Sequence, residues 1–161
     1  MHAGPVIIGF DGSRSALRAM DEAAPLLGGQ RVLVVVVWEA GHAFDLAENA
    51  STGFDNPVGS LDLSGAFAAD QAANEAAVRL AERGAQLATA TGLTAEGLAV
   101  ADDATVAETI LRLATERDAR AIVLGSHNHA RLGEMLFGST TREILDHASC
   151  PVVVVRAEDK A

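Results

Sequence analysis

Two short segments of the sequence combine residue types that could bind an anion such as phosphate. Gly138-Ser139-Thr140 opens a helix-like run, and Gly125 ends an apolar run. Free N–H groups and the dipole at the start of a helix favour phosphate oxygens, and nearby hydroxyls add donors. Glycine lets the chain leave a strand sharply and lets a ligand approach the backbone closely. We therefore expect an anion-binding loop across 125–140.

A lone carboxylate, Asp11, follows the first apolar run. An acidic side chain at the tip of a strand can accept hydrogen bonds from ribose hydroxyls, as in dinucleotide-binding folds. Plainer roles are also available, because an aspartate after a strand is often a turn residue and "GST" before a helix is often an N-cap. Taken alone, these residues leave nucleotide binding and the local roles both open.

The elements that must position these residues alternate between strands and helices. Short apolar, β-branched runs predict five strands, at 5–10, 31–38, 94–101, 120–125 and 151–156. Helical periodicity predicts helices from 13 to the Gly28-Gly29 pair, with Pro25 kinking or ending the first, and at 64–91, 103–117 and 140–148. Alternation of this kind predicts one α/β domain, 1–161, with a doubly wound five-stranded parallel sheet and helices on both faces.

Ligands of such sheets bind beyond the carboxyl ends of the strands, where the strand order reverses. If the first and fourth strands are neighbours, Asp11 faces the 125–140 loop there. Two further segments have no regular pattern. The 39–63 segment predicts a long loop, either a lid or partner-facing loop or a disordered insertion, and 157–161 predicts a polar tail.

Composition excludes several classes of function. The net charge of −10 argues against binding to nucleic acid or to anionic membranes. No apolar run approaches the roughly 20 residues that span a bilayer, no secretory signal opens the chain, and Cys150 is the single cysteine. We therefore expect a cytoplasmic protein, with Cys150 a buried small hydrophobe.

Known phosphate and metal motifs are also missing. The sequence has no GxxxxGK[ST], no GxGxxG after a strand, and no acidic pair typical of a response-regulator receiver. His127, His129 and His147 lack the cysteine or carboxylate neighbours that a zinc site needs, so no metal site made by the protein is expected.

A spaced motif lies inside the 125–140 segment. Gly125 is followed by two residues and Asn128, then by nine residues and Gly138-Ser139; the chain also begins with "VIIGFDGS" and ends with "FGSTTREILDHASCPVVVVR". The sequence resembles the universal stress protein family, whose fingerprint is Gly, two residues, Gly, nine residues, Gly-Ser/Thr. Asn128 stands where the family has its second glycine, and asparagine tolerates the left-handed backbone well. Its amide could hydrogen-bond a phosphate or crowd one.

The resemblance implies a strand order of 3-2-1-4-5 and the ATP-binding branch of the family. Asp11 would meet the ribose beside Gly9, and Val37 would offer backbone groups to adenine. Gly125 and the segment Asn128–Arg131 would surround the ribose and phosphates, with contacts from Asn128, His129 and Arg131. The β- and γ-phosphates would be held by Gly138, Ser139 and Thr140. The expected ligand is ATP, or AMP or ADP, with Mg²⁺ or Mn²⁺ bound mainly through the phosphates.

The last strand is apolar and, in this order, lies at a sheet edge. Exposed apolar edges aggregate unless they are paired, so the resemblance also implies a homodimer through Val152–Val155. We expect a nucleotide-binding stress or signalling protein, with an unknown protein partner and no assigned catalytic residue. The alternatives are a slow ATPase or nucleotide-dependent transferase, and a nucleotide-free dimeric scaffold. An enzyme would need a positioned base, and Asp11, Glu134 and the loop histidines are candidates that the sequence does not place.

Overall fold

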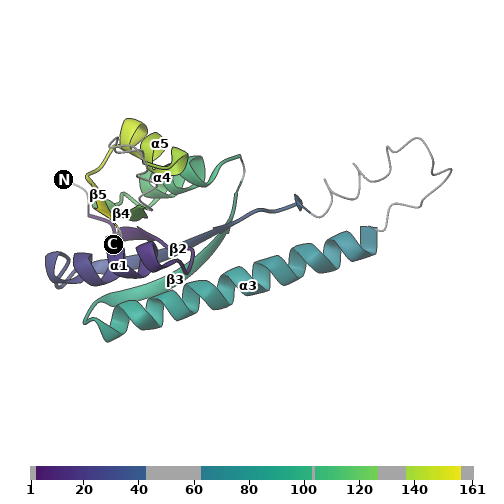
Figure 1. Cartoon of the computed structure of the whole chain (residues 1–161), viewed down its shortest axis with the longest axis horizontal. Coiled ribbons are helices and arrows are strands. Elements are labelled where there is room, and N and C mark those ends of the chain that lie inside the picture. Colours follow the sequence, from purple (N-terminus) through teal and green to yellow (C-terminus); the bar gives the residue numbers. More distant parts are fainter. Residues whose placement is uncertain (1–2, 43–62, 103, 127–136, 157–161) are drawn as a thin grey trace, which may run out of the picture.

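The computed structural model describes residues 3–42, 63–102, 104–126 and 137–156, and it contains a single sheet covered by helices (Figure 1). The strands are β1 (Val6–Gly9), β2 (Arg31–Trp38), β3 (Thr94–Ala101), β4 (Ala121–Ser126) and β5 (Val152–Arg156). The helices are α1 (Arg14–Ala23), the short 3-10 helix η1 (Ala24–Leu26), α3 (Leu63–Ala90), α4 (Val106–Glu116) and α5 (Ser139–His147).

The five strands are parallel and lie in the order β3-β2-β1-β4-β5, which confirms the predicted fold. β1 is central: Val6 pairs with Val32 of β2 on one side and with Ala121 of β4 on the other. The strand order reverses beside β1, because the chain runs outward through β2 and β3 and then returns to β4. Asp11 and the end of β4 therefore meet at the switch point, as the prediction required.

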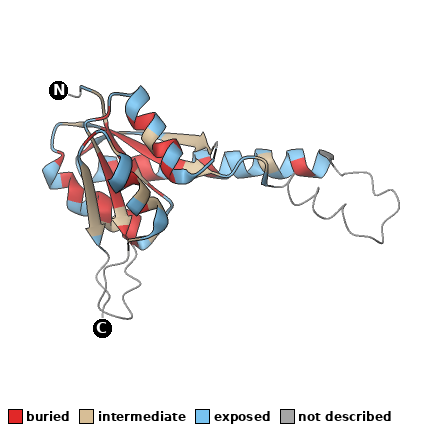
Figure 2. Ribbon diagram, turned by 90° about the horizontal axis from the view of Figure 1, so that it is seen from above, coloured by how far each residue is buried: buried red, intermediate tan, exposed pale blue. Residues whose placement is uncertain are grey.

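Both faces of the sheet are buried, which explains the continuous apolar runs (Figure 2). Successive residues of β1 point to opposite faces, so Ile8 packs in one core with α1 and α3, and Ile7 packs in a second core with α4 and α5. Each isoleucine is fully buried. Burial of this kind stabilises the fold by roughly 1.5–3 kcal/mol per side chain. The two cores fix the positions of the strand ends that contribute residues to the site.

Small side chains let α3 lie close to the sheet. Its buried positions recur at helical spacing, at Ala77, Ala81, Ala85 and Ala88. The amino-terminal half of α3 extends beyond the sheet, where most of its side chains are exposed (Figures 1 and 2). The alanine-rich composition of this helix thus serves close packing over its second half.

Capping residues explain where two helices begin and end. Ser13 caps α1, because its Oγ accepts a hydrogen bond from the Ala16 N–H at 3.2 Å. Pro25 lies in the 3-10 turn that follows Ala23, so the proline ends α1 as expected. α4 begins at Val106, three residues later than predicted, because the Thr105 hydroxyl caps it by accepting from the Glu108 N–H at 3.0 Å.

β5 is an edge strand that pairs with β4 through Val152–Arg156. The side chains of Val152–Val155 are half-buried. None of the helices in the described ranges is both long and apolar enough to cross a membrane.

Candidate functional site

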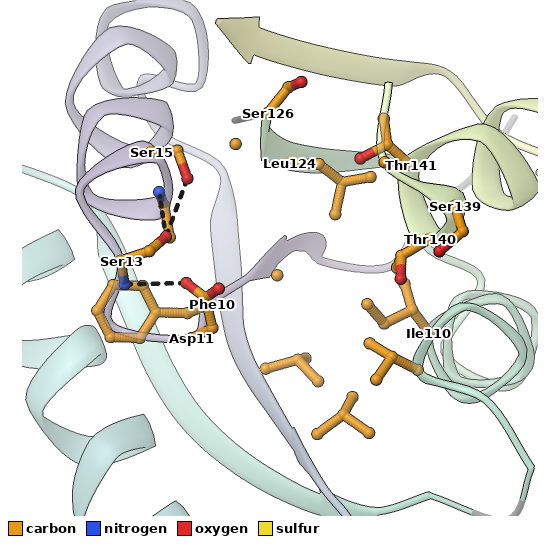
Figure 3. A pocket seen from close by; sticks show the side chains of 17 residues that line it. Phe10, Asp11, Ser13, Ser15, Ile110, Leu124, Ser126, Ser139, Thr140 and Thr141 are labelled. Atoms are coloured by element: carbon orange, nitrogen blue, oxygen red, sulfur yellow. Dashed lines mark hydrogen bonds between the residues drawn. The ribbon is translucent and has the colours of Figure 1, made fainter. Parts of the chain in front are cut away.

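A cavity of about 380 Å³ opens at the switch point, between the first turns of α1 and α5 (Figure 3). Seven of the predicted site residues line it: Gly9, Asp11, Val37, Gly125, Gly138, Ser139 and Thr140. The other predicted contacts, Asn128, His129 and Arg131, lie outside the described residues. The structure thus gathers residues from β1, β2, β4 and α5 around one space.

Asp11 has a local role at the start of α1. Its Oδ1 accepts a hydrogen bond from the Ser13 N–H at 2.9 Å, which closes an Asx turn ahead of the helix (Figure 3). The side chain is exposed and lines the cavity. Asp11 is therefore a turn residue, which was one of the two roles that the sequence left open. It also lies where a ribose contact is expected.

Gly125 serves packing between α1 and β4. A Cβ at this position would lie 2.3 Å from the Ser15 carbonyl oxygen and 2.7 Å from the Ala16 nitrogen. Only glycine lets the first turn of α1 approach β4 this closely. β4 also continues through Gly125 to Ser126, so the chain does not leave the strand at the glycine as the sequence suggested.

Gly138 has a different environment. It is the N-cap of α5, with φ −57° and ψ 159°, and none of the described side chains caps the helix. A Cβ at Gly138 would meet no atom of the described residues within 4 Å. The first N–H groups of a helix have no partner within the helix. The start of α5 therefore presents donors and open space to the cavity, and it lacks the hydroxyl N-cap that was the plainer interpretation of "GST".

Val37 lies in the part of β2 that continues beyond the last residue of β1. In a parallel ladder, alternate residues direct their backbone groups to opposite sides. The Val35 carbonyl accepts from the Phe10 N–H at 2.8 Å, on the β1 side, and the Trp38 carbonyl accepts from the Asp102 N–H at 2.9 Å, on the β3 side. Val37 has the orientation of Val35, so its N–H and C=O face the space beyond the end of β1.

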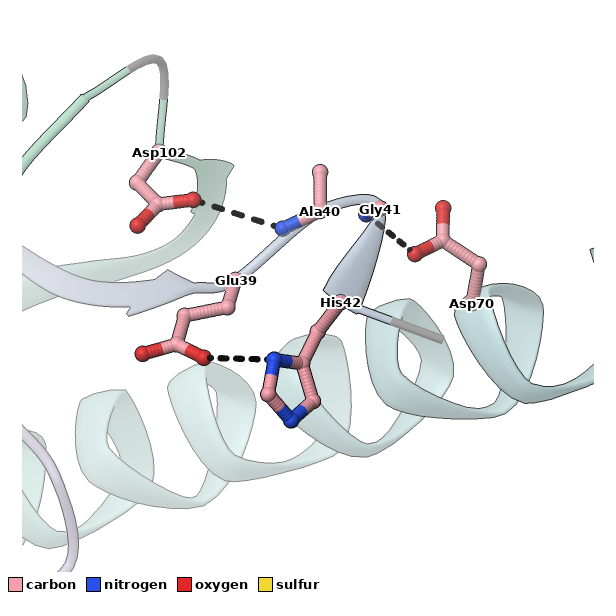
Figure 4. A network of polar contacts seen from close by, with 6 residues as sticks. All are labelled: Glu39, Ala40, Gly41, His42, Asp70 and Asp102. Atoms are coloured by element: carbon pink, nitrogen blue, oxygen red, sulfur yellow. Dashed lines mark hydrogen bonds and ion pairs between the residues drawn. The ribbon is translucent and has the colours of Figure 1, made fainter. Parts of the chain in front are cut away.

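Two carboxylates hold the chain that leaves β2 (Figure 4). Asp102 accepts a hydrogen bond from the Ala40 N–H at 3.3 Å, and Asp70 of α3 accepts from the Gly41 N–H at 2.7 Å. A longer contact, 3.6 Å between His42 Nδ1 and Glu39 Oε2, lies on the surface and is an ion pair when the imidazole is protonated. These contacts extend the β2–β3 pairing past the last strand residue and support the end of β2 that carries Val37.

The cavity has an apolar wall that the sequence did not identify. Val106 and Ile110 from α4 and Leu124 from β4 contribute to it, and Val37 lies on the same lining. Val106 and Ile110 are four residues apart, so they lie on one face of the helix. The spacing was visible in the sequence, but it is the spacing of any core-facing helix, and it did not distinguish a pocket wall from core.

Polar side chains were also missed. Ser13, Ser15, Ser126 and Thr141 line the cavity (Figure 3). Ser126 and Thr141 directly follow the predicted contacts Gly125 and Thr140, so only their side-chain direction was unknown.

Metal-binding side chains do not gather in the described part of the chain, where no group of three or more His, Cys, Asp or Glu could hold an ion. The ring of His147 contacts its own helix, with Nδ1 2.9 Å from the Glu143 carbonyl oxygen. His127 and His129 lie outside the described residues.

Cys150 is buried, as expected, two residues before β5 begins at Val152. Burial raises the pKa of its thiol above the usual value, which disfavours the reactive thiolate.

Comparison with known protein families shows to which family this chain belongs. A profile of the universal stress protein family matches residues 3–156. The chain belongs to the universal stress protein family. A search of curated proteins finds no match.

Solved structures of universal stress proteins share this fold at low sequence identity. One from Archaeoglobus fulgidus, in complex with dAMP, is 21% identical over 96% of this chain and 98% of its own, with a TM-score of 0.62. A family member from Arabidopsis thaliana with AMP bound is 14% identical over 97% and 93%, with a TM-score of 0.61. A universal stress protein in complex with cAMP is 19% identical over 97% and 98%, with a TM-score of 0.59.

Proposed function

We propose that this universal stress protein binds an adenine nucleotide, ATP or its products ADP and AMP, in the switch-point cavity. One observation carries the proposal: the cavity joins the backbone groups of Val37 at the end of β2, which have no hydrogen-bond partner among the described residues, to the amino terminus of α5. The first suits the edge of a base, and the second suits phosphate oxygens. Relatives with dAMP, cAMP and AMP bound support the same ligand class.

The base end combines shape with hydrogen bonding. Adenine carries a donor and acceptors on its edge, and the N–H and C=O of Val37 are complementary to that pattern. The apolar side chains of Ile110 and Leu124 offer a surface against which the ring would pack. Asp11 lines the cavity at the start of α1, where its carboxylate would accept from ribose hydroxyls.

The described part of the phosphate end is made of neutral donors. The first-turn N–H groups of α5 and the hydroxyls of Ser139 and Thr140 would hold phosphate oxygens, and we expect Asn128, His129 and Arg131 to complete the enclosure. A divalent cation, Mg²⁺ or Mn²⁺, fits this donor set through the phosphates and one or two hydroxyls, because magnesium usually has few protein ligands in such sites. The cation would neutralise phosphate charge.

The lining favours a binding protein over an enzyme. Among the described residues that line the cavity, Asp11 is the only one with an acidic or basic side chain, and one of its oxygens already accepts the Ser13 N–H. Hydrolysis needs a base positioned on the attacking water. We therefore propose a stress-response or signalling role, in which a protein partner responds to nucleotide occupancy.

A second copy of the chain would pair with β5. This strand has a neighbour on one side, β4, and Val152–Val155 keep part of their apolar surface accessible. Pairing two such edges across a two-fold axis would bury that surface. A monomer at micromolar concentration in analytical ultracentrifugation would refute the dimer.

Analysis of co-purified nucleotide tests the proposed function. Purified protein is denatured, the released nucleotide is identified by chromatography, and stripped protein is titrated with adenosine, AMP and ATP with and without Mg²⁺. Release or binding of an adenine nucleotide supports the proposal, and time-dependent conversion of ATP would favour the slow ATPase. No release and no binding would point to the nucleotide-free scaffold.

A further inference from the structure

Asp70 occupies a position in α3 where the helical pattern favours an apolar side chain. It lies seven residues before Ala77 and eleven before Ala81, so the three share one face of the helix, the face that packs on the sheet. Ala77 and Ala81 are buried, whereas Asp70 is half-buried in the amino-terminal half of α3, which extends beyond the sheet (Figure 1). A carboxylate on such a face is unfavourable unless it is hydrogen-bonded.

The partner of this carboxylate is the chain that leaves β2 (Figure 4). The Gly41 N–H donates to Asp70 Oδ1 at 2.7 Å. Gly41 has a φ of 81°, which glycine adopts readily, so the chain turns at the residue that meets α3. A hydrogen bond to an ionised acceptor is roughly twice as strong as one between neutral groups. α3 therefore holds the chain four residues after Val37.

The segment held in this way has little other support. β1 pairs with β2 as far as Val35, so the only strand beside Val36–Trp38 in the described part of the chain is β3. Beyond the strand, the Ala40 N–H donates to Asp102 at 3.3 Å, a longer contact. A strand end with one neighbour opens more readily than one with two. Asp70 thus supplies a second support, from a different element.

The proposed base contact needs this segment to be fixed. The N–H and C=O of Val37 would bond to the edge of adenine together, and such a pair of contacts tolerates about 0.5 Å of displacement. We propose that Asp70 is a positioning residue for adenine: its bond to Gly41 holds the end of β2 so that both backbone groups of Val37 meet the base. This inference rests on the proposed function and deepens it, because it assigns base specificity to a residue that does not line the cavity.

Calorimetric titration of the full-length chain with AMP and IMP tests the proposal. IMP has a carbonyl in place of the adenine amino group, so the donor and acceptor on that edge are exchanged and neither bond to Val37 can form. Wild-type protein should bind AMP at least about tenfold more tightly than IMP. Asp70→Ala should weaken AMP binding about threefold to tenfold and leave IMP binding unchanged, so the ratio of the two affinities falls.

Two matched variants separate the hydrogen bond from charge. Asp70→Asn removes the charge and keeps an acceptor oxygen, so its AMP-to-IMP ratio should stay within about twofold of wild type. Asp21→Ala makes the same exchange at an exposed position of α1 and should leave the ratio unchanged. Urea denaturation shows that each variant is folded.

The tryptophan fluorescence of nucleotide-free protein gives a second measurement. Trp38 is the single tryptophan of the sequence and directly follows Val37. Asp70→Ala should shift its emission to longer wavelength, because a looser strand end exposes the half-buried indole to water. Asp21→Ala should not shift it. An unchanged emission in Asp70→Ala would contradict the loosening of β2.

The outcomes distinguish this inference from the proposed function. An equal loss of AMP and IMP in Asp70→Ala would show a purely structural role, and an equal loss of AMP binding in Asp70→Asn and Asp70→Ala would show an effect of charge; either result overturns the positioning role. Equal binding of AMP and IMP by wild-type protein overturns it too and leaves nucleotide binding standing. If neither AMP nor ATP binds with or without Mg²⁺, the proposed function fails and the positioning role fails with it.

Discussion

Gly125 and Gly138 look alike in the sequence and differ in the structure. Each borders the same cavity and each belongs to the same spaced motif. A Cβ at Gly125 would collide with the backbone of α1, at 2.3 Å from the Ser15 oxygen, whereas a Cβ at Gly138 would meet nothing among the described residues. The first glycine is required by the protein itself, and the second leaves space that the described protein does not fill.

The starts of α1 and α5 show the same contrast. α1 is capped from within, because the Ser13 hydroxyl accepts the Ala16 N–H. α5 has Gly138 as its N-cap, and no side chain in the described part of the protein caps it. A motif of this family therefore mixes positions that stabilise the fold with positions that leave donors available, and mutations can separate the two.

Gly125→Ala should cause the largest change in stability. The added methyl group meets backbone atoms that cannot rotate away, so α1 must move off β4, and overpacking of this kind costs about 1–3 kcal/mol. The free energy of unfolding from urea denaturation measures the loss. Gly28→Ala is the control, because an added Cβ there has no neighbour within 4 Å and Gly28 is exposed. Equal free energies of unfolding for the two variants would contradict the packing role of Gly125.

Gly138→Val should separate binding from stability. The branched side chain projects into open space at the start of α5, so the free energy of unfolding should fall by no more than about 1 kcal/mol, the cost of replacing a glycine N-cap by an apolar residue. Nucleotide affinity should fall more than about tenfold, because the side chain occupies the approach to the helix N–H groups. Calorimetry and urea denaturation of one preparation give both numbers. An unchanged nucleotide affinity would contradict a phosphate site at the start of α5.

Ser13→Ala should lower stability by about 1 kcal/mol, the usual contribution of a serine N-cap. The midpoint of thermal unfolding should fall by roughly 2–4 °C for a domain of this size. An unaltered midpoint would mean that water replaces the cap without loss.

Gly138→Ser is the reverse experiment and has the smallest expected effect. The backbone angles at Gly138 suit serine, and a serine N-cap is better than glycine by a few tenths of a kcal/mol. Stability should rise slightly while nucleotide affinity falls, because the new hydroxyl competes for the N–H groups. A loss of stability would show that the position is not open, and a gain in affinity would show that the hydroxyl binds the ligand.

Most of the fold follows from the sequence because its signals are local. The alternation of apolar strands and periodic helices predicted all five strands to within one residue at each end. The resemblance supplied the order of the strands, which no local pattern encodes. The start of α4 was misjudged because Asp103 looked as helix-compatible as its neighbours, and only the contact of Thr105 with the Glu108 N–H identifies the cap.

The site was less predictable because it depends on which way side chains point. Asp11, Gly125 and Gly138 were found through glycine, charge and helix-start signals. Ser126 and Thr141 carry no such signal, since a serine in a strand and a threonine in a helix are ordinary until the neighbouring element is known. The sequence also did not show why residue 125 must be glycine. The backbone atoms that exclude a side chain there belong to Ser15 in α1, 110 residues away in the sequence.

The unequal lengths of β1 and β2 have a consequence for how such a protein can change over time. Beyond the last residue of β1, the sheet offers main-chain atoms of residue 37, and these are the same whatever side chain the residue bears. The base contact that we propose at this end of β2 is therefore insulated from substitution of the side chain. Position 37 can drift among residues that fit the strand, and a sequence comparison that looks for a preserved letter there would overlook the contact.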